Sequence, residues 1–104
     1  MQRLGFKMKL FDGFATEYKK RHDELWPELK NLLREKGIEE YSIFLDEETN
    51  ILFAYLVIKD EKHLDELAQN EIMQEWWDFM KDIMETNEDN SPVTHTLKEV
   101  FCLV

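Results

Sequence analysis

Hydrophobic and polar residues alternate along this chain with two different periods. In residues 3–10 and 41–45, apolar side chains occupy every second position, which is typical of a strand with one face on a core. Residues 12–36 instead carry apolar side chains at three- and four-residue spacing, the period of an amphipathic helix. Because Pro27 lacks a backbone donor and its ring clashes with the preceding turn, we expect this helix to break near 23–26 and to restart at Pro27.

A hairpin is predicted next. The polar turn 46–50 separates the strand at 41–45 from a continuous apolar run at 51–58. A sheet with one face in water does not tolerate a strand that is apolar on both sides. We therefore expect the free face of the sheet to be covered by a ligand, a second subunit or both.

The helical period returns after the hairpin. Asp60 is the predicted N-cap, residues 68–70 are expected to interrupt the helix, and three-four spacing then continues to Met84. Alternation over 97–104 predicts a last strand, in which Cys102 is expected to be a buried thiol. With a single cysteine, the chain can form no internal disulfide.

The predicted order is strand, helix, strand, strand, helix, strand. This is the order of the ferredoxin-like βαββαβ unit, an α+β fold in which helices cover one face of an antiparallel sheet. No repeat, low-complexity tract or linker divides the sequence. We therefore expect one domain over residues 1–104.

Charge and composition exclude several classes of partner. The formal net charge of −10 disfavours nucleic acid and anionic membrane surfaces, because binding there depends on lysine and arginine neutralising phosphates. No apolar run approaches the ~20 residues of a membrane-spanning helix, and no export signal is visible, so we expect a cytoplasmic protein. His22, His63 and His95 share no short ligand spacing, so no metal site is expected.

His22 is the main candidate for chemistry. Phe14, Tyr18 and His22 recur every fourth residue, which places them on one otherwise apolar helix face. A histidine there is either a core residue hydrogen-bonded to backbone or to a tyrosine, or a proton-transfer group in a dry pocket. Tyr18, one turn earlier, either orients the ring and binds a polyol or packs as an ordinary aromatic residue.

Trp76 and Trp77 are the second unusual feature. Adjacent indoles on a helix point about 100° apart, so at least one faces something other than the main core. A tryptophan that faces a pocket offers a flat apolar surface to the C–H face of a sugar. The alternative is that one indole lies in the core and the other lies across a subunit interface. Tyr41 can supply a phenol to the same cavity.

At this level of detail the sequence resembles the L-rhamnose mutarotase family over essentially its whole length. The resemblance rests on several short motifs that occur in order and at matching spacing, none of which is decisive alone. They are Glu17-Tyr18 with Arg21-His22, Trp26-Pro27-Glu28-Leu29, the strand at 41–46, Trp76-Trp77 with Met80, the loop at 89–93 and the ending at 97–101.

Membership would imply a homodimer of ferredoxin-like subunits whose sheets face each other as an α/β barrel, with no metal or organic cofactor. The substrate would be the α or β anomer of L-rhamnose. By this resemblance His22 matches the family's proton donor, and Tyr18, Tyr41, Trp76 and Trp77 match its sugar-binding positions. Two other functions fit the same architecture, since a fold does not fix a function: a cofactor-independent monooxygenase and a non-catalytic ligand-binding module.

Overall fold

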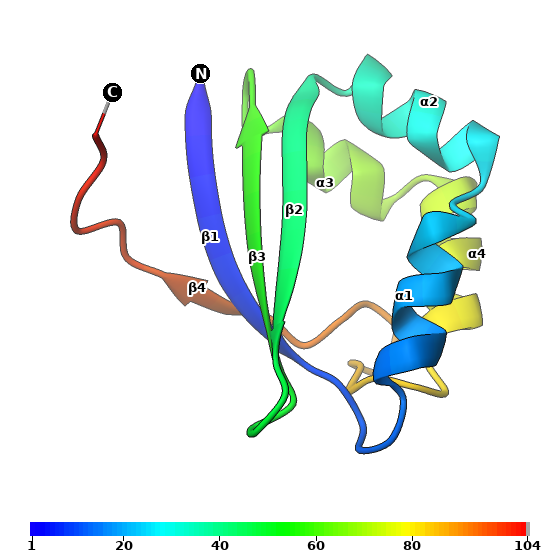
Figure 1. The fold of residues 1–104 in the computed structure, drawn as a ribbon. Helices are drawn as coiled ribbons and strands as arrows, with labels where there is room; N and C mark the ends of the chain where they lie inside the picture. The colour runs from blue at the N-terminus through cyan, green and yellow to red at the C-terminus, as the bar shows by residue number, and fades with distance from the viewer. Residues whose placement is uncertain (104) are drawn as a thin grey trace.

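A computed structural model describes residues 1–103 of the chain. Within these residues, the strands and helices follow one another in the order β1, α1, α2, β2, β3, α3, α4, β4 (Figure 1). Their bounds are Gln2–Lys9 for β1, Ala15–Asp23 for α1, Pro27–Glu35 for α2, Ile38–Asp46 for β2, Ile51–Ile58 for β3, His63–Ala68 for α3, Glu71–Met80 for α4 and His95–Leu97 for β4.

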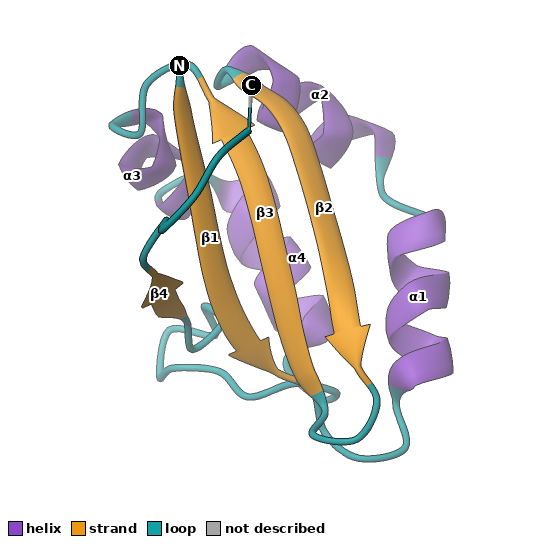
Figure 2. Cartoon of the chain, turned by 60° about the vertical axis from the view of Figure 1, so that its left-hand side comes forward, coloured by secondary structure: helices purple, strands orange, loops and turns teal. Residues whose placement is uncertain are grey.

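The strands form one antiparallel sheet in the order β2-β3-β1-β4, and the helices lie against one of its faces (Figure 2). The register places Phe6 of β1, Ala54 of β3 and Ile43 of β2 side by side across the sheet. These residues share the face toward the helices. The strand order and the single helical layer confirm the predicted α+β fold of ferredoxin-like topology.

Both predicted interruptions of the helices are present. The first helical region is divided between α1, which ends at Asp23, and α2, which begins with Pro27 in its first turn. The second is divided between α3 and α4, and the Asn70 side chain caps α4 by accepting a hydrogen bond from the Ile72 backbone N–H at 2.9 Å. Because of these breaks, α1 and α4 can be oriented independently of α2 and α3.

The core lies between the sheet and the helices. Leu10, Leu29, Leu52, Ile58 and Ile83 are its most completely buried large side chains. The inward positions of β1, β2 and β3 meet the apolar faces of α2 and α4, so burial of these residues supplies the main driving force of folding.

The opposite face of the sheet is open in the single chain. Phe44 is 68% exposed, and its cross-strand neighbour Phe53 and Tyr55 on β3 are exposed as well. One chain alone therefore leaves this face exposed, and the expected cover by a ligand or a second subunit stays a prediction.

The last strand is shorter than predicted. We predicted a strand over 97–104, but β4 ends at Leu97, and residues 98–103 have no regular structure; Val104 lies outside the described residues. Alternation of apolar residues shows that two faces differ, whereas a strand also needs a hydrogen-bonded neighbour, and only three residue pairs join β4 to β1. For the same reason the prediction of a buried Cys102 is wrong, since its thiol is exposed.

Two predicted helix limits are also wrong. Lys62, not Asp60, is the N-cap of α3, because the Asp60 carboxylate instead accepts a hydrogen bond from the Lys62 N–H and stabilises the turn before the helix. The second limit concerns α4, which ends at Met80 rather than at Met84. Met84 forms an isolated antiparallel bridge with Leu10, and this pairing turns the chain back toward the sheet.

Candidate active site

Helix α1 places Tyr18 and His22 one turn apart on its inner side. Their rings stack with centroids 4.2 Å apart and planes 26° from parallel. The Tyr18 residue is buried, whereas Phe14, which we predicted to continue the same row, is 37% exposed and does not line the cavity. The row of three predicted from the spacing is therefore a pair.

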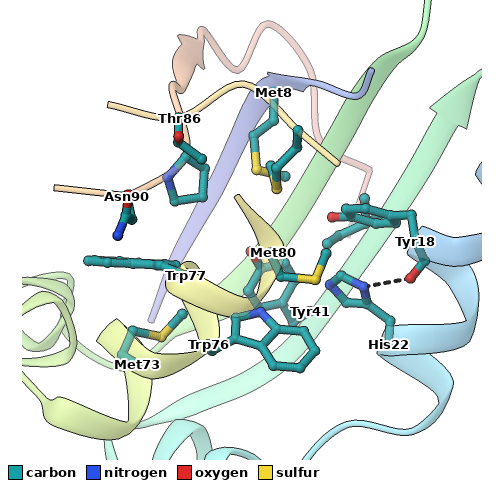
Figure 3. A pocket seen from close by; sticks show the side chains of 13 residues that line it. Met8, Tyr18, His22, Tyr41, Met73, Trp76, Trp77, Met80, Thr86 and Asn90 are labelled. Atoms are coloured by element: carbon teal, nitrogen blue, oxygen red, sulfur yellow. Dashed lines mark hydrogen bonds between the residues drawn. The ribbon is translucent and has the colours of Figure 1, made fainter. Parts of the chain in front are cut away.

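A backbone hydrogen bond fixes the proton on one nitrogen of His22. The Nδ1 atom lies 3.0 Å from the carbonyl oxygen of Tyr18, and a carbonyl can only accept, so Nδ1 carries the hydrogen (Figure 3). The other ring nitrogen, Nε2, turns toward the cavity on the side of Met80. Burial lowers the pKa of His22 below its usual value, and the Tyr18 carbonyl only partly offsets this. The neutral imidazole thus presents an Nε2 lone pair to the cavity.

The two phenols of the site hold their protons firmly. Burial raises the pKa of Tyr18 well above its usual range and raises the pKa of Tyr41 to about 12. Tyr41, from β2, is 41% exposed as a residue, but its phenol group is the buried end. Near neutral pH both hydroxyls are therefore hydrogen-bond donors, and neither is a ready base.

Helix α4 supplies the indoles. Trp76 is buried and meets the His22 ring edge-on, with centroids 5.4 Å apart and planes at 88°. It also meets the ring of Trp26, from the turn before α2, at 5.2 Å. Trp77 is half-buried, and both tryptophans line the same cavity as His22 (Figure 3). Trp76 also belongs to the buried core, whereas Trp77 packs against it from the half-buried side. The alternative that one indole meets a second subunit stays a prediction.

One cavity of about 70 Å³ brings together all five predicted site residues. It is lined by Met8, Tyr18, His22, Tyr41, Ile43, Met73, Trp76, Trp77, Met80, Met84, Thr86, Asn90 and Pro92. A larger groove of about 350 Å³ on the side of α2 and β2 is also bounded by His22 and Tyr41. His22 and Tyr41 therefore separate the inner cavity from the groove.

Sequence reasoning did not assign the loop residues of this cavity. Thr86 and Asn90 come from the segment after α4, where Asn90 adopts a left-handed backbone with φ 71° and the Asn87 N–H bonds the Ser91 carbonyl at 2.7 Å. Asn90 and Pro92 lie in the loop that carries part of the family resemblance, which was the one available signal. Met8 and Ile43 follow from strand alternation, since inward positions of β1 and β2 face the helices.

Within residues 1–103, no three or more His, Cys, Asp or Glu side chains are grouped so that they could hold a metal ion. Over the same residues, no helix is both long and apolar enough to cross a membrane.

Fold and site together define a small α+β protein of ferredoxin-like topology whose aromatic cavity is built around one neutral histidine. A family model described as L-rhamnose mutarotase matches residues 3–103. An L-rhamnose mutarotase from Lachnoclostridium phytofermentans is 57% identical over 103 residues, which make up 99% of each chain. A crystal structure of an L-rhamnose mutarotase from Formosa agariphila superimposes with a TM-score of 0.93 at 56% identity and covers 100% of both chains. The chain belongs to the L-rhamnose mutarotase family.

More distant structures share the fold. One is a putative antibiotic biosynthesis monooxygenase from Nitrosomonas europaea, with a TM-score of 0.64 at 13% identity over 97% of this chain and 100% of that one. At this identity the likeness concerns backbone architecture alone, so it gives no support to the oxygenase alternative.

Proposed function

We propose that the protein interconverts the α and β anomers of L-rhamnose, with His22 as the group that moves the proton. Membership of the family supports the reaction, and one observation supports the role of His22: a neutral imidazole presents its free nitrogen to an aromatic cavity. An acid-base group that ionises not far from neutral pH can accept a proton and return it without a large penalty in either direction.

The reaction needs only proton transfers and one bond rotation. Nε2 of His22 removes the proton of the anomeric hydroxyl, the bond between the anomeric carbon and the ring oxygen breaks, and the anomeric carbon becomes an aldehyde. The protonated His22 then donates the same proton to the ring oxygen. The aldehyde rotates about its bond to the neighbouring carbon, and the reverse steps close the ring on the other face. Protons balance, and nothing is oxidised or reduced.

The other four residues bind and orient the sugar in this proposal. Tyr18 and Tyr41 donate hydrogen bonds to sugar oxygens, because their raised pKa values keep them protonated. Trp76 and Trp77 stack on the C–H side of the open and closed sugar. Such an apolar wall leaves the aldehyde free to turn.

The sugar is proposed to occupy more than the inner cavity. About 70 Å³ is smaller than the roughly 300–1,000 Å³ of usual small-molecule sites. The neighbouring groove of about 350 Å³ shares His22 and Tyr41 with this cavity, so a sugar that extends into the groove would keep its anomeric centre beside His22.

A second copy of the chain is proposed to cover the open face of the sheet, so that two sheets face each other as a dimeric α/β barrel. In support, Phe44, Phe53 and Tyr55 leave an exposed apolar patch there. The apolar tail residues Phe101 and Leu103 are 77% and 87% exposed, as expected of a segment that packs on another subunit. The predicted single domain over 1–104 and the cytoplasmic location stay predictions.

Replacement of His22 tests the proposal. Saturation-transfer NMR on L-rhamnose at anomeric equilibrium should show fast exchange with the protein, and His22→Ala should reduce the enhancement by roughly 10²–10⁴-fold, the usual worth of a positioned acid-base group. His63→Ala is the matched control, because His63 is an exposed histidine that pairs with Glu66 on α3. It should leave exchange unchanged.

Full exchange in a folded His22→Ala protein would contradict the proposed role of His22. The same experiment separates the two alternatives. A ligand-binding module would broaden the sugar signals without exchanging them, and a monooxygenase specific for an aromatic substrate would leave the sugar signals unchanged.

A further inference from the structure

We propose that Arg21 is a positioning residue that holds α1 against the carboxyl end of α4 and so sets the distance between the acid-base half and the indole half of the site. Tyr18 and His22 lie on α1, whereas Trp76 and Trp77 lie on α4. This inference rests on the proposed function only because the experiments that test it measure anomer exchange. Arg21 itself lines neither the inner cavity nor the groove.

The guanidinium of Arg21 is held by acceptors on three residues, one on α1, one on α4 and one in the turn that follows α4. Its Nε donates to Glu17 on α1 at 2.8 Å. Its Nη1 donates to the Phe79 carbonyl at 2.7 Å and to one Asp82 carboxylate oxygen at 2.8 Å, while Nη2 reaches the other oxygen at 3.3 Å. The Arg21 side chain is only 12% exposed. A side chain so enclosed and so fully paired has one position available to it.

The contact also completes the end of α4. The last four carbonyls of a helix lack intrahelical partners and carry a partial negative charge. Helix α4 has no basic residue in its last turn. The C-cap residue Lys81 pairs with Asp78. Arg21, in contrast, brings a cation from α1 and bonds the carbonyl of Phe79, the next-to-last residue of α4. Stability of this helix end is thereby linked to the position of α1.

A continuous row of packed rings joins Arg21 to His22. The guanidinium carbon lies 4.5 Å from the centre of the Phe79 ring, in cation–π contact. The Phe79 ring lies 5.7 Å from Trp76, which in turn lies 5.4 Å from His22. A shift of Arg21 would therefore move the indole that meets the imidazole edge-on.

Lysine cannot replace this set of bonds. A guanidinium presents five donors in a planar fork, whereas an ammonium is a single point charge on a flexible stem. Both charges of the Arg21–Asp82 pair also persist over a wide pH range, because their hydrogen bonds raise the pKa of Arg21 and lower the pKa of Asp82. The link between α1 and α4 is therefore present at neutral pH.

Arg21→Met removes the donors and keeps the length of the side chain. We expect kcat/KM for anomer exchange to fall about 10–100-fold, since displacement of a reacting group by about 1 Å can cost 10²-fold. We also expect the NMR titration of His22 to move up toward its ordinary pKa as the cavity loosens. Arg21→Lys should recover only part of the activity.

Lys19→Met is the matched control. Lys19 makes an exposed ion pair with Asp23 on the same helix, four residues apart like Glu17 and Arg21, but it bonds nothing on α4. It should leave both exchange and the His22 titration unchanged. Asp82→Asn is a second variant at a mostly exposed position, so it should fold and reproduce part of the Arg21→Met effect.

The proposal is overturned if folded Arg21→Met, or Asp82→Asn where Arg21→Met does not fold, exchanges anomers at the normal rate. It is also overturned if exchange falls while the His22 titration stays in place. Failure of the proposed function looks different. In that case His22→Ala itself would retain exchange, whatever the Arg21 variants do.

Discussion

His22 is subject to two opposed effects on its proton affinity. Burial among Tyr18, Tyr41 and Trp76 disfavours the charged ring, while the bond from Nδ1 to the Tyr18 carbonyl favours it. Burial is the larger effect, so the pKa of His22 lies below its ordinary value of about 6.5. The residue is then neutral at physiological pH, and in the proposed mechanism it starts as a base.

The lowered pKa of His22 leads to a prediction about the pH dependence of activity. Protonation below the lowered His22 pKa removes the Nε2 lone pair, so kcat/KM for anomer exchange should fall as the pH drops through that pKa and should be level well above it. Activity should also stay high well above pH 7, since the pKa of Tyr41 is about 12 and its hydroxyl therefore keeps its proton there. A pH series of the exchange rate checks this.

A pH profile of the opposite shape would mean that His22 starts the reaction in its protonated form. Activity that is high at pH 5 and falls above pH 6 would mean that the reactive free enzyme carries a protonated imidazole. An NMR titration of the His22 ring in the same buffers serves as the control, because its midpoint should match that of the kinetic profile.

Four-residue spacing predicted the stacked pair of Tyr18 and His22, but it failed for Phe14, which precedes the first residue of α1. His22 and Tyr18 share a helix face because they are four residues apart, and adjacent Trp76 and Trp77 cannot both point into the core. All of them line one cavity. Asn90 could not be placed in this way, because the path of a loop depends on tertiary contacts that no periodicity encodes.

At the scale of elements, the sequence predicted the interruptions of the helices better than the ends of the last helix and the last strand. Pro27 and Asn70 each act on their own turn, so the interruptions beside them follow from the sequence. The end of α4 depends instead on the bridge between Leu10 and Met84, which lie far apart in the chain. The limit of β4 likewise depends on whether the edge of β1 continues to offer a partner.

The junction of α2 and β2 gives a prediction at this scale. Gly37 has φ 88°, and an added Cβ would lie 3.3 Å from Cβ of Lys59. Gly37→Ala should therefore lower the free energy of unfolding by about 2 kcal/mol, which combines the left-handed backbone cost with displacement of Lys59. Urea denaturation measures it.

Gly13→Ala separates the two contributions. Gly13 has φ 87° but nothing within 4 Å of an added Cβ, so only the backbone cost of about 1 kcal/mol applies. Equal losses in the two variants would show that the Lys59 contact costs nothing.

At the scale of the whole molecule, the single chain is asymmetric. One face of the sheet is covered by helices, while the other exposes Phe44, Phe53 and Tyr55. With a formal net charge of −10, a second copy is attractive only through apolar contact, since like-charged subunits repel. The sequence predicted that the free face is covered, because the run at 51–58 is apolar on both sides, but it left open whether a ligand or a second subunit covers it.

Phe44→Glu tests the proposed dimer. A carboxylate at the centre of an apolar interface would be desolvated without a partner, so the variant should sediment as a monomer where the parent protein is a dimer. Phe11→Glu is the control, because Phe11 is 42% exposed but lies in the loop after β1. A dimer that survives Phe44→Glu would place the interface elsewhere.

The hydrogen-bond acceptor that fixes the tautomer of His22 is the main-chain oxygen of Tyr18. This limits which changes in sequence can alter the site. No amino-acid substitution can delete a carbonyl of the helix, whereas a carboxylate partner would be lost by a single mutation. The imidazole therefore keeps its tautomer while the surrounding aromatic and loop residues change. If His22 is the base as proposed, the residues around it can change to fit a differently substituted sugar while the tautomer of its ring stays set by the backbone.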